Sequence, residues 1–302
     1  MPITIEEVVQ QIPDWKDQSV TIQPLSGGLT NTNYRVEVNG TPYFVRIPGA
    51  GTDLLAVDRK NEYHNTRAAA EAGVGPRVLH YLPEHDVMAL EFIPGQTMSN
   101  SLLAAPGMPS RIAASLRKLH AGPRFLTNFN MFRLIEFYLR MVDDHAVPIP
   151  QGYHGRLSLV QQIETAVTAH GLPTVPCNND LLAENYIDDG RQLRLIDFEY
   201  SGNNDPCFEL GNTCQELQYD QARFAELCAA YFGIARRHLL ARMRLFALMS
   251  DVGWTLWGAI QAKVSQIDYD FWGYATGRWE RAQSILDSPA FGEWLGEAIR
   301  PD

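Results

Sequence analysis

The sequence predicts an α+β protein of two lobes, a small antiparallel sheet followed by a larger and mainly helical lobe. Three observations lead to this fold class. The first third of the chain alternates short β-rich segments with turn residues, most of the rest has helical periodicity, and one loop-and-hairpin segment interrupts the helical part. A chain of 302 residues is long enough for two sizeable cores. We place the first lobe in residues 1–93 and the second in residues 94–302, with Pro94-Gly95 at the connection.

The first lobe is expected to hold a five-stranded antiparallel sheet and one helix. The expected strands are residues 19–25, 33–38, 42–47, 77–82 and 86–92. Helical periodicity runs from Asp53 to Gly73. The glycine and the following Pro76 are typical of a helix end.

The second lobe is expected to be helical except at one segment. Helical periodicity is present at residues 108–121, 131–143, 155–170, 206–232, 236–266 and 268–286. Between Val175 and Tyr200 the sequence instead predicts a loop, a strand, a turn and a second strand, because Asp188-Asp189-Gly190 suits a hairpin turn. A cleft between two such lobes is a natural place for a ligand.

Composition excludes several classes of protein. A formal net charge of −10 argues against nucleic acid and anionic membranes as main partners. No apolar run is long enough for a membrane helix, and the acidic start MPITIEEVVQ lacks the order of a signal peptide, so we expect a cytoplasmic location. The four cysteines form no CxxC pair, which indicates reduced thiols and no zinc site.

Asp180, Asn185 and Asp197 form the pattern that points most directly to chemistry. They lie in NNDLLAEN and LIDFE, on the predicted loop and hairpin. A loop aspartate can accept the proton of a hydroxyl group, while an asparagine and an aspartate can present oxygen ligands to one Mg²⁺ ion. Each residue alone could equally cap a turn. The three together, in this order, favour phosphoryl transfer over that alternative.

Arg46 and Glu62 are candidates for contact with phosphate. Arg46 ends a predicted strand, and Glu62 lies in the following helix. A cation braced by a helix carboxylate could contact the phosphates of a nucleotide, and arginine can bind phosphate in a bidentate way. The alternative is a surface ion pair that contributes little.

A glycine-containing turn lies between the first two predicted strands. It contains Gly27, Gly28, Thr30 and Asn31. Glycines let a backbone approach phosphate, and the hydroxyl and amide groups add donors. The double glycine could also be an ordinary turn. The chain has no Walker A loop and no dinucleotide-binding fingerprint.

Segments similar to one kinase family run through nearly the whole chain in order. They are GGLTNTNYRV (27–36), FVRIPG (44–49), RKNEYHN (59–65), GVGPRVL (73–79), EFIPGQTM (91–98), CNNDLLAEN (177–185), LIDFEYSGNNDPCFELGN (195–212) and WTLWGAIQAKVSQIDYDFWGYATGRWERA (254–282). On these segments the chain resembles the choline/ethanolamine kinase family, within the aminoglycoside-phosphotransferase-like group of the protein-kinase fold. The resemblance implies a protein-kinase-like fold and an ATP- and Mg²⁺-dependent kinase. Its acceptor would be the hydroxyl group of choline or ethanolamine, and with choline the products would be phosphocholine and ADP.

The resemblance also implies roles for individual residues. Asp180 would be the catalytic base, and the metal ligands would be Asn185, Asp197 and Glu199. The ATP-binding residues would be Gly27, Gly28, Thr30, Asn31, Arg46, Glu62 and, in the hinge between the lobes, Glu91, Phe92 and Ile93. The acceptor pocket would contain Tyr200, Glu216, Tyr219, Trp254 and Trp257. The two tryptophans are three residues apart on a predicted helix, so their rings could attract a trimethylammonium group, although core packing is the alternative.

Two positions depart from the family pattern. Asn178 stands where the family usually has a histidine that supports the loop; because asparagine also donates and accepts hydrogen bonds, we expect activity to be retained. Leu217 replaces an aromatic residue beside the pocket and leaves one wall less aromatic. Other acceptors therefore remain as alternatives, including thiamine, an aminoglycoside or another amine. A further alternative is a protein that binds nucleotide or choline without catalysis. No oligomeric state is predicted.

Overall fold

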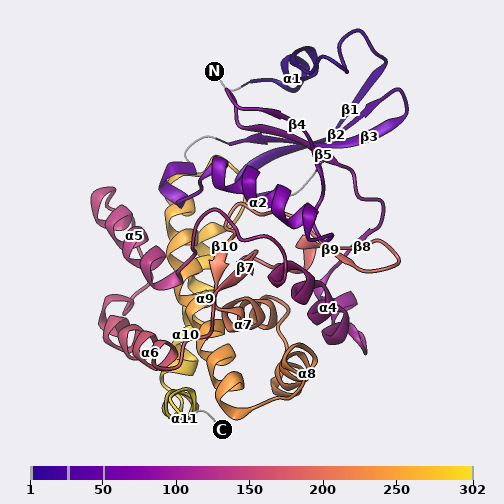
Figure 1. Ribbon diagram of the computed structural model, residues 1–302. Helices are drawn as coiled ribbons and strands as arrows, with labels where there is room; N and C mark the ends of the chain where they lie inside the picture. Colours follow the sequence, from indigo (N-terminus) through magenta and orange to yellow (C-terminus); the bar gives the residue numbers. More distant parts are fainter. Residues whose placement is uncertain (1–2, 26–27, 50–51, 301–302) are drawn as a thin grey trace.

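The computed structural model describes residues 3–25, 28–49 and 52–300, and Figure 1 shows its sheet lobe above its helical lobe. Five antiparallel strands form the first lobe in the order β1-β2-β3-β5-β4. They are β1 (Val20–Leu25), β2 (Asn31–Val38), β3 (Thr41–Pro48), β4 (Val78–Leu82) and β5 (Val87–Glu91). The predicted five-stranded sheet is therefore confirmed, apart from small shifts at the strand ends.

A short helix, α1 (Ile5–Gln11), accompanies this sheet and was absent from the sequence prediction. Its buried side chains join the sheet's hydrophobic core, together with Trp15. Thr4 and Glu7 form a capping box at its start. The helix is too short to show clear periodicity, but its capping box was a readable signal in the sequence.

The helix predicted from Asp53 to Gly73 is in fact two elements. A 3₁₀ turn, η1 (Thr52–Leu55), precedes helix α2 (Arg59–Glu71), and Ala56 between them has φ of 59°. The side chain of Asp58 caps α2 by accepting two backbone N–H groups. The predicted helix end is confirmed, because Gly73 adopts φ of 77°.

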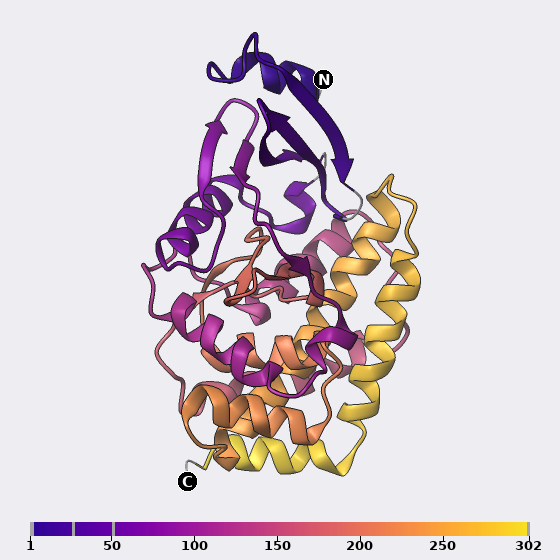
Figure 2. The ribbon, with the colours of Figure 1, turned by 90° about the vertical axis from the view of Figure 1, so that its right-hand side faces the viewer.

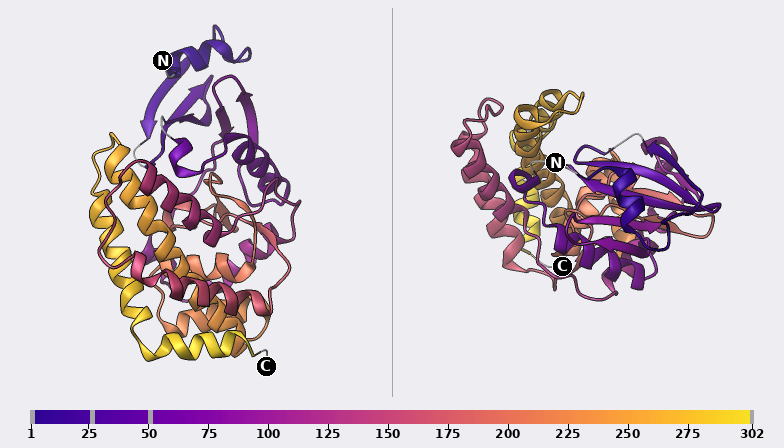
Figure 3. Two further views of the ribbon diagram at one scale, coloured as in Figure 1. Left: turned by 90° about the vertical axis from the view of Figure 1, so that its left-hand side faces the viewer. Right: turned by 90° about the horizontal axis from the view of Figure 1, so that it is seen from above.

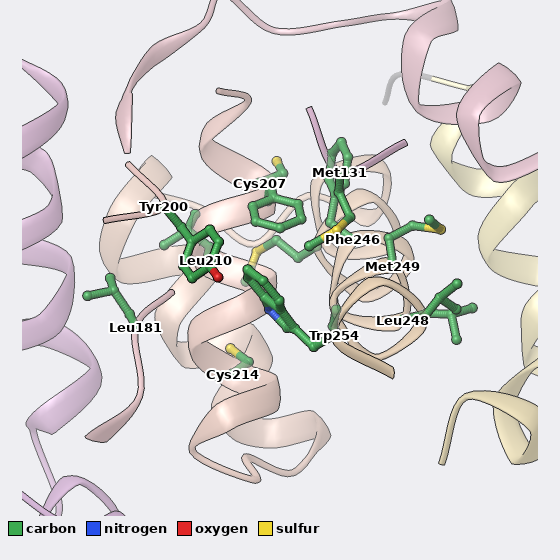
Figure 4. Packing of buried hydrophobic residues seen from close by; sticks show 14 of the residues in the cluster. Met131, Leu181, Tyr200, Cys207, Leu210, Cys214, Phe246, Leu248, Met249 and Trp254 are labelled. Carbon is green, nitrogen blue, oxygen red and sulfur yellow. The ribbon is translucent and has the colours of Figure 1, made fainter. Parts of the chain in front are cut away.

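The second lobe is mainly helical, as predicted. Its helices are α3 (Asn100–Leu103), α4 (Met108–His120), α5 (Met131–Asp144), α6 (Leu157–Ala169), α7 (Pro206–Glu216), α8 (Gln221–Phe232), α9 (Arg237–Val264), α10 (Phe271–Leu286) and α11 (Pro289–Ala298). Helix α9 runs through the lobe and packs against α5, α7, α10 and α11 (Figures 2 and 3). Its side chains Leu248, Met249 and Trp254 contribute to the core shown in Figure 4.

Two helix predictions in this lobe need correction. The single helix predicted over 206–232 is α7 and α8, separated by residues 217–220. Gln218 between them has φ of 53°, and Asp220 caps α8. Helices α3 and α11 were not predicted. The physical reason for the first error is that both helices are amphipathic, so periodicity alone does not reveal the break.

Short strands at the junction of the lobes frame the predicted loop and hairpin. They are β6 (Gln96–Thr97), β7 (Val175–Cys177), β8 (Tyr186–Asp188), β9 (Leu193–Leu195) and β10 (Gly202–Asn204). The β8–β9 hairpin is confirmed, and β7 pairs with β10. The backbone N–H of Leu195 donates to the carbonyl of Val74 at 2.9 Å, which ties the hairpin to the first lobe.

All four cysteines are buried, and none of them forms a disulfide within the described residues. Within the described residues, no helix combines the length and the apolar character that crossing a bilayer requires. The boundary placed after residue 93 stays a prediction; β5 ends at Glu91 and β6 begins at Gln96, on either side of it.

Candidate active site between the lobes

Helix α7 holds the predicted catalytic loop, residues 178–185, in place. The buried carboxylate of Glu209 accepts the backbone N–H groups of Asn178 at 3.0 Å and Asn179 at 3.1 Å. Asn212, one turn further along α7, accepts the N–H of Leu181 at 3.0 Å. Burial raises the pKa of Glu209 to about 7, although the two backbone N–H groups oppose this rise. The loop's backbone is thereby fixed to a buried helix.

Asp180 is half-buried at the centre of this loop. Its N–H donates to the side-chain oxygen of Asn178 at 3.1 Å, and its carbonyl accepts the side-chain amide of Asn185 at 2.7 Å. Burial raises the pKa of Asp180 well above its ordinary value, and repulsion from nearby carboxylates, Glu216 foremost, adds to this. A carboxylate with raised proton affinity suits the acceptance of a proton from a hydroxyl group.

Asp197 is joined to both lobes. Its carbonyl accepts the side-chain amide of Asn178 at 2.6 Å, and its carboxylate accepts Nη1 of Arg46 at 2.8 Å. Its φ of 62° lies in the left-handed region, which is uncommon outside glycine and clusters at functional sites. Asn178, which is fully buried, thus links the catalytic loop to Asp197. This is the supporting task that the resemblance assigns to a histidine.

Glu62 joins two arginines, Arg46 and Arg59, whose side chains are 6% and 9% exposed. Its Oε1 accepts Nη1 of Arg46 at 2.5 Å, and its Oε2 accepts Nη1 of Arg59 at 2.7 Å. Burial by itself would lower the pKa of Arg46, but the carboxylates of Asp197, Glu62 and Glu199 raise it above the ordinary value. The predicted pair of Arg46 and Glu62 is therefore a buried contact and not a surface ion pair. Arg59 was not identified from the sequence.

Glu199 connects the LIDFE segment to the glycine-containing turn. Both of its oxygens accept the hydroxyl of Thr30, at 2.8 and 2.9 Å, and Oε2 also accepts the amide of Asn31 at 3.0 Å. Burial, followed by the neighbouring Asp197, raises the pKa of Glu199 to about 7. Gly28 has φ of 97°, and a Cβ there would approach the side-chain nitrogen of Asn33 to 2.9 Å, so the turn requires glycine. The predicted Gly27 lies outside the described residues.

The predicted metal ligands lie close to Asp180 and suit Mg²⁺. Asn185 offers an amide oxygen, and Asp197 and Glu199 offer carboxylate oxygens, which are the donors that Mg²⁺ prefers. Asp197 and Glu199 both act electrostatically on Asp180. The donor set thus fits a hard divalent cation beside Asp180.

The predicted hinge connects β5 to the second lobe. Glu91 ends β5, and its side chain accepts the backbone N–H of Arg77 at 3.2 Å. Phe92 lies under the guanidinium of Arg35 at 5.2 Å, and Ile93 is buried. Adenine binding at this segment stays a prediction.

Several predicted pocket residues meet near Asp180. Tyr200 accepts Nε1 of Trp257 at 2.8 Å, and its pKa is raised by burial, with Asp180 among the charges that add to this. Glu216 accepts Nη2 of Arg278 at 2.7 Å, while its Oε1 is buried without a partner among the described residues. Tyr200 and Glu216 therefore lie close enough to Asp180 for their charges to interact, and Trp257 is bonded to Tyr200; their place in an acceptor pocket stays a prediction.

Two residues beside this pocket were missed by the sequence analysis. Tyr274 lies 5.5 Å from the ring of Trp257, centroid to centroid, and its pKa is raised by burial, with the charge of Asp180 among those that add to this. The guanidinium of Arg278 stacks over the Tyr274 ring at 4.4 Å. The two are four residues apart on α10, so their shared helix face was a signal available in the sequence.

Trp254 and Tyr219 have surroundings unlike those of Trp257. Trp254 is 2% exposed and packs among apolar side chains, with its ring 4.9 Å from that of Tyr200 (Figure 4). Tyr219 donates its hydroxyl to the carbonyl of Leu103 at 2.6 Å. Leu217, at the end of α7, is buried. Core packing, the alternative weighed for the tryptophan pair, therefore describes Trp254; pocket roles for it and Tyr219 stay predictions.

A buried polar cluster lies behind the catalytic loop. The ligand atoms of His120, Cys177 and Glu209 all lie within 4.8 Å of one another, although spacing in the sequence suggested no such group. His120 also contacts the hydroxyl of Tyr231 at 2.6 Å, and Cys177 at 3.7 Å. Burial lowers the pKa of His120 to about 3, so the imidazole is neutral. We interpret the cluster as hydrogen-bonded support for the loop.

Comparison with known proteins gives consistent matches. The family profile described as Choline/ethanolamine kinase matches residues 22–228. Ethanolamine kinase 1 of Mus musculus is 28% identical over 313 residues, covering 89% of this chain and 85% of that protein. A choline/ethanolamine kinase family protein from Mesorhizobium loti superposes with a TM-score of 0.84 at 36% identity, covering 96% of each chain. Choline kinase LicA from Streptococcus pneumoniae shares the fold, with a TM-score of 0.79 at 22% identity over 93% of this chain and 98% of that one.

Proposed function

Because this chain belongs to the choline/ethanolamine kinase family, a family of phosphotransferases with an alcohol group as acceptor, we propose that it phosphorylates choline with Mg²⁺ and ATP. The observation that carries this proposal is the meeting of five separate segments at one place. The glycine-containing turn, β3, α2, the catalytic loop and the LIDFE segment are joined by hydrogen bonds through Arg46, Asp197 and Glu199. This is the set of groups that phosphoryl transfer requires.

In the proposed reaction the acceptor's hydroxyl oxygen attacks the γ-phosphorus of ATP. The new O–P bond forms as the bond to the ADP oxygen breaks, and the hydroxyl proton passes to the carboxylate of Asp180. The raised pKa of Asp180 favours acceptance of this proton. Asn178 and Asn185 hold the backbone of Asp180 on both sides, so the base is oriented before the substrate binds.

Mg²⁺ would be held by Asn185, Asp197 and Glu199, and it would neutralise charge on the phosphates. Arg46, oriented by Glu62, would contribute donors to the same phosphates. The backbone of Gly28 and the side chains of Thr30 and Asn31 would border the phosphates from the first lobe. Residues Glu91 to Ile93 would contact the adenine.

Choline is proposed as acceptor because aromatic rings flank the base. Tyr200 and Trp257 are linked to each other, and Tyr274 packs against Trp257. Their faces suit a trimethylammonium group, each contributing about 0.5–2 kcal/mol. The relative from Streptococcus pneumoniae is named a choline kinase.

Ethanolamine is the second candidate, and a specific observation favours it. The buried Oε1 of Glu216 has no hydrogen-bond partner among the described residues. A primary ammonium group could donate a hydrogen bond to this oxygen, whereas the quaternary nitrogen of choline has no N–H group. The mouse relative is named an ethanolamine kinase.

The test is ADP release with Mg·ATP in the presence of choline, ethanolamine, thiamine or kanamycin. We expect kcat/KM to be highest with choline. A higher value with ethanolamine would replace choline as the acceptor, and a rate with thiamine or kanamycin alone would reject both amino alcohols.

Asp180→Asn identifies the base in the same assay. It should lower kcat by about 10²–10⁴-fold while leaving ATP binding in place, because it removes the proton acceptor at nearly constant shape. Full activity in this variant would reject the proposed base. Absence of turnover with every acceptor, together with retained ATP binding, would instead support a non-catalytic binder.

A further inference from the structure

Arg59 is a buried cation that has no role in the reaction proposed above. It is the first residue of α2, and its side chain is 9% exposed. Its Nη1 donates to Glu62 at 2.7 Å and to Glu199 at 3.3 Å. Its Nε and Nη2 are buried and have no hydrogen-bond partner among the residues that the structure describes. Buried donors without partners are rare because each one costs free energy, so these two nitrogens point to a ligand.

The surroundings of Arg59 indicate what kind of ligand this is. Glu62 binds Arg46 with one oxygen and Arg59 with the other, so a single carboxylate sets two guanidinium groups side by side. Glu199, the other partner of Arg59, is also bonded to Thr30 in the glycine-containing turn. Arg59 is therefore linked through Glu199 to the turn and to the LIDFE segment. The Nε of Arg46 is likewise buried without a partner in the described part of the chain.

The charged groups around Arg59 favour an anion that binds together with a cation. Two arginines, Arg46 and Arg59, face three carboxylates, those of Glu62, Asp197 and Glu199. An anion without a cation would be repelled by this net negative charge. A divalent cation held by Asp197 and Glu199 would offset that charge. The free guanidinium N–H groups then match phosphate oxygens, which accept charge-assisted hydrogen bonds in a planar, forked arrangement.

We propose that Arg59 is a second phosphate-binding arginine, held beside Arg46 by Glu62 and donating Nε and Nη2 to phosphate oxygens of the bound nucleotide. This inference rests on the proposed function, because it takes the ligand to be ATP or ADP. It adds a residue of α2 to the nucleotide site. It also gives Glu62 a second task, since this carboxylate orients both arginines.

The experiment measures the affinity of the full chain for ADP and for adenosine, with Mg²⁺ present, by calorimetry. Arg59→Gln should weaken ADP binding by about 10–100-fold, the effect of losing charge-assisted hydrogen bonds. Adenosine has no phosphate, so its affinity should stay within about twofold of the wild type. Arg67→Gln is the matched control, because Arg67 is an exposed arginine of the same helix, and both of its affinities should be unchanged.

Two outcomes would overturn the inference while leaving the proposed function intact. ADP affinity within about twofold of the wild type would show that Arg59 does not contact phosphate. Equal losses for ADP and adenosine would show that Arg59 only maintains the shape of the site. If the wild type itself binds no ADP, the proposed function fails, and the inference fails with it.

Arg59→Lys keeps the test decisive if the glutamine variant does not fold. Lysine retains the positive charge beside Glu62 and Glu199, but its single ammonium group cannot reproduce the planar fork. We expect a selective loss of ADP affinity of about 5-fold or more, with adenosine affinity unchanged. Wild-type ADP affinity in this folded variant would contradict the forked contact.

Discussion

Asn178→Ala tests whether the residue that replaces the family histidine supports the active site. The side chain of Asn178 makes three hydrogen bonds, donating to the carbonyls of Ile196 at 3.2 Å and Asp197 at 2.6 Å and accepting the N–H of Asp180 at 3.1 Å. Each bond contributes about 0.5–1.5 kcal/mol net. Some of the partners are half-buried and can recover a bond to water, so we expect the free energy of unfolding to fall by about 2 kcal/mol.

The effect on catalysis should exceed the effect on stability. The lost bonds connect Asp180, the proposed base, to Asp197, a proposed metal ligand. Misplacement of a reacting group by about 1 Å costs on the order of 10²-fold in rate, so kcat should fall by about that factor. Asn178→His should recover part of kcat, because an imidazole N–H can again donate to one of the two carbonyls.

The assay combines guanidinium chloride unfolding with steady-state kinetics on the acceptor that the wild type uses best. Asn128→Ala is the control; Asn128 is exposed, and its variant should unfold within about 0.5 kcal/mol of the wild type and retain full kcat. The reasoning would be refuted if Asn178→Ala matched this control in both stability and kcat. A loss of stability with unchanged kcat would show that Asn178 stabilises the loop without orienting the base.

The two tryptophans and the buried histidine give further predictions. Trp254→Ala should lower the free energy of unfolding by about 3–5 kcal/mol in denaturant titration, because the ring is 2% exposed in the core; a small loss accompanied by a raised acceptor KM would show that it lines the pocket instead. Trp257→Phe removes the bond to Tyr200 and should raise the acceptor KM several-fold while the ATP KM stays constant; equal changes in both would reject a pocket role. Burial lowers the pKa of His120 to about 3. Below about pH 6.5 the unfolded chain therefore binds a proton that the folded chain does not. The free energy of unfolding then falls on acidification by up to about 1.4 kcal/mol per pH unit. His120→Gln should therefore lose less stability than the wild type between pH 7 and about pH 5 in parallel unfolding titrations, and an identical pH dependence would contradict a neutral buried imidazole.

The order of elements was readable from the sequence because it depends on local properties. Alternation and turn residues predicted the sheet of the first lobe, and the Asp188 to Gly190 turn predicted the β8–β9 hairpin. Breaks between amphipathic helices were harder to see. Gln218, which separates α7 from α8, is a residue type that carries no breaking signal of its own.

The candidate site was only partly readable, because its contacts join residues far apart in the chain. Asp180, Asn185 and Asp197 could be selected from their order on a loop and hairpin. Arg59 could not, because its importance depends on Glu199, which lies 140 residues away. Glu209 could not be selected either, because it holds the catalytic loop by accepting two of that loop's backbone N–H groups.

The sequence was sufficient to predict the two-lobe α+β fold, the kinase family and the residues suited to base and metal chemistry. The fold and these residues follow from residue type, spacing and turn propensity, which are properties of neighbouring residues, and the family follows from the resemblance of segments along the chain. The tertiary structure shows which of those residues contact one another and how deeply each is buried. It separated Trp254, packed among apolar side chains, from Trp257, bonded to Tyr200, although both lie on the same helix three residues apart. Burial, electrostatic coupling and hydrogen-bond partners arise when distant segments pack together, and helical periodicity does not record which neighbour a helix face will meet.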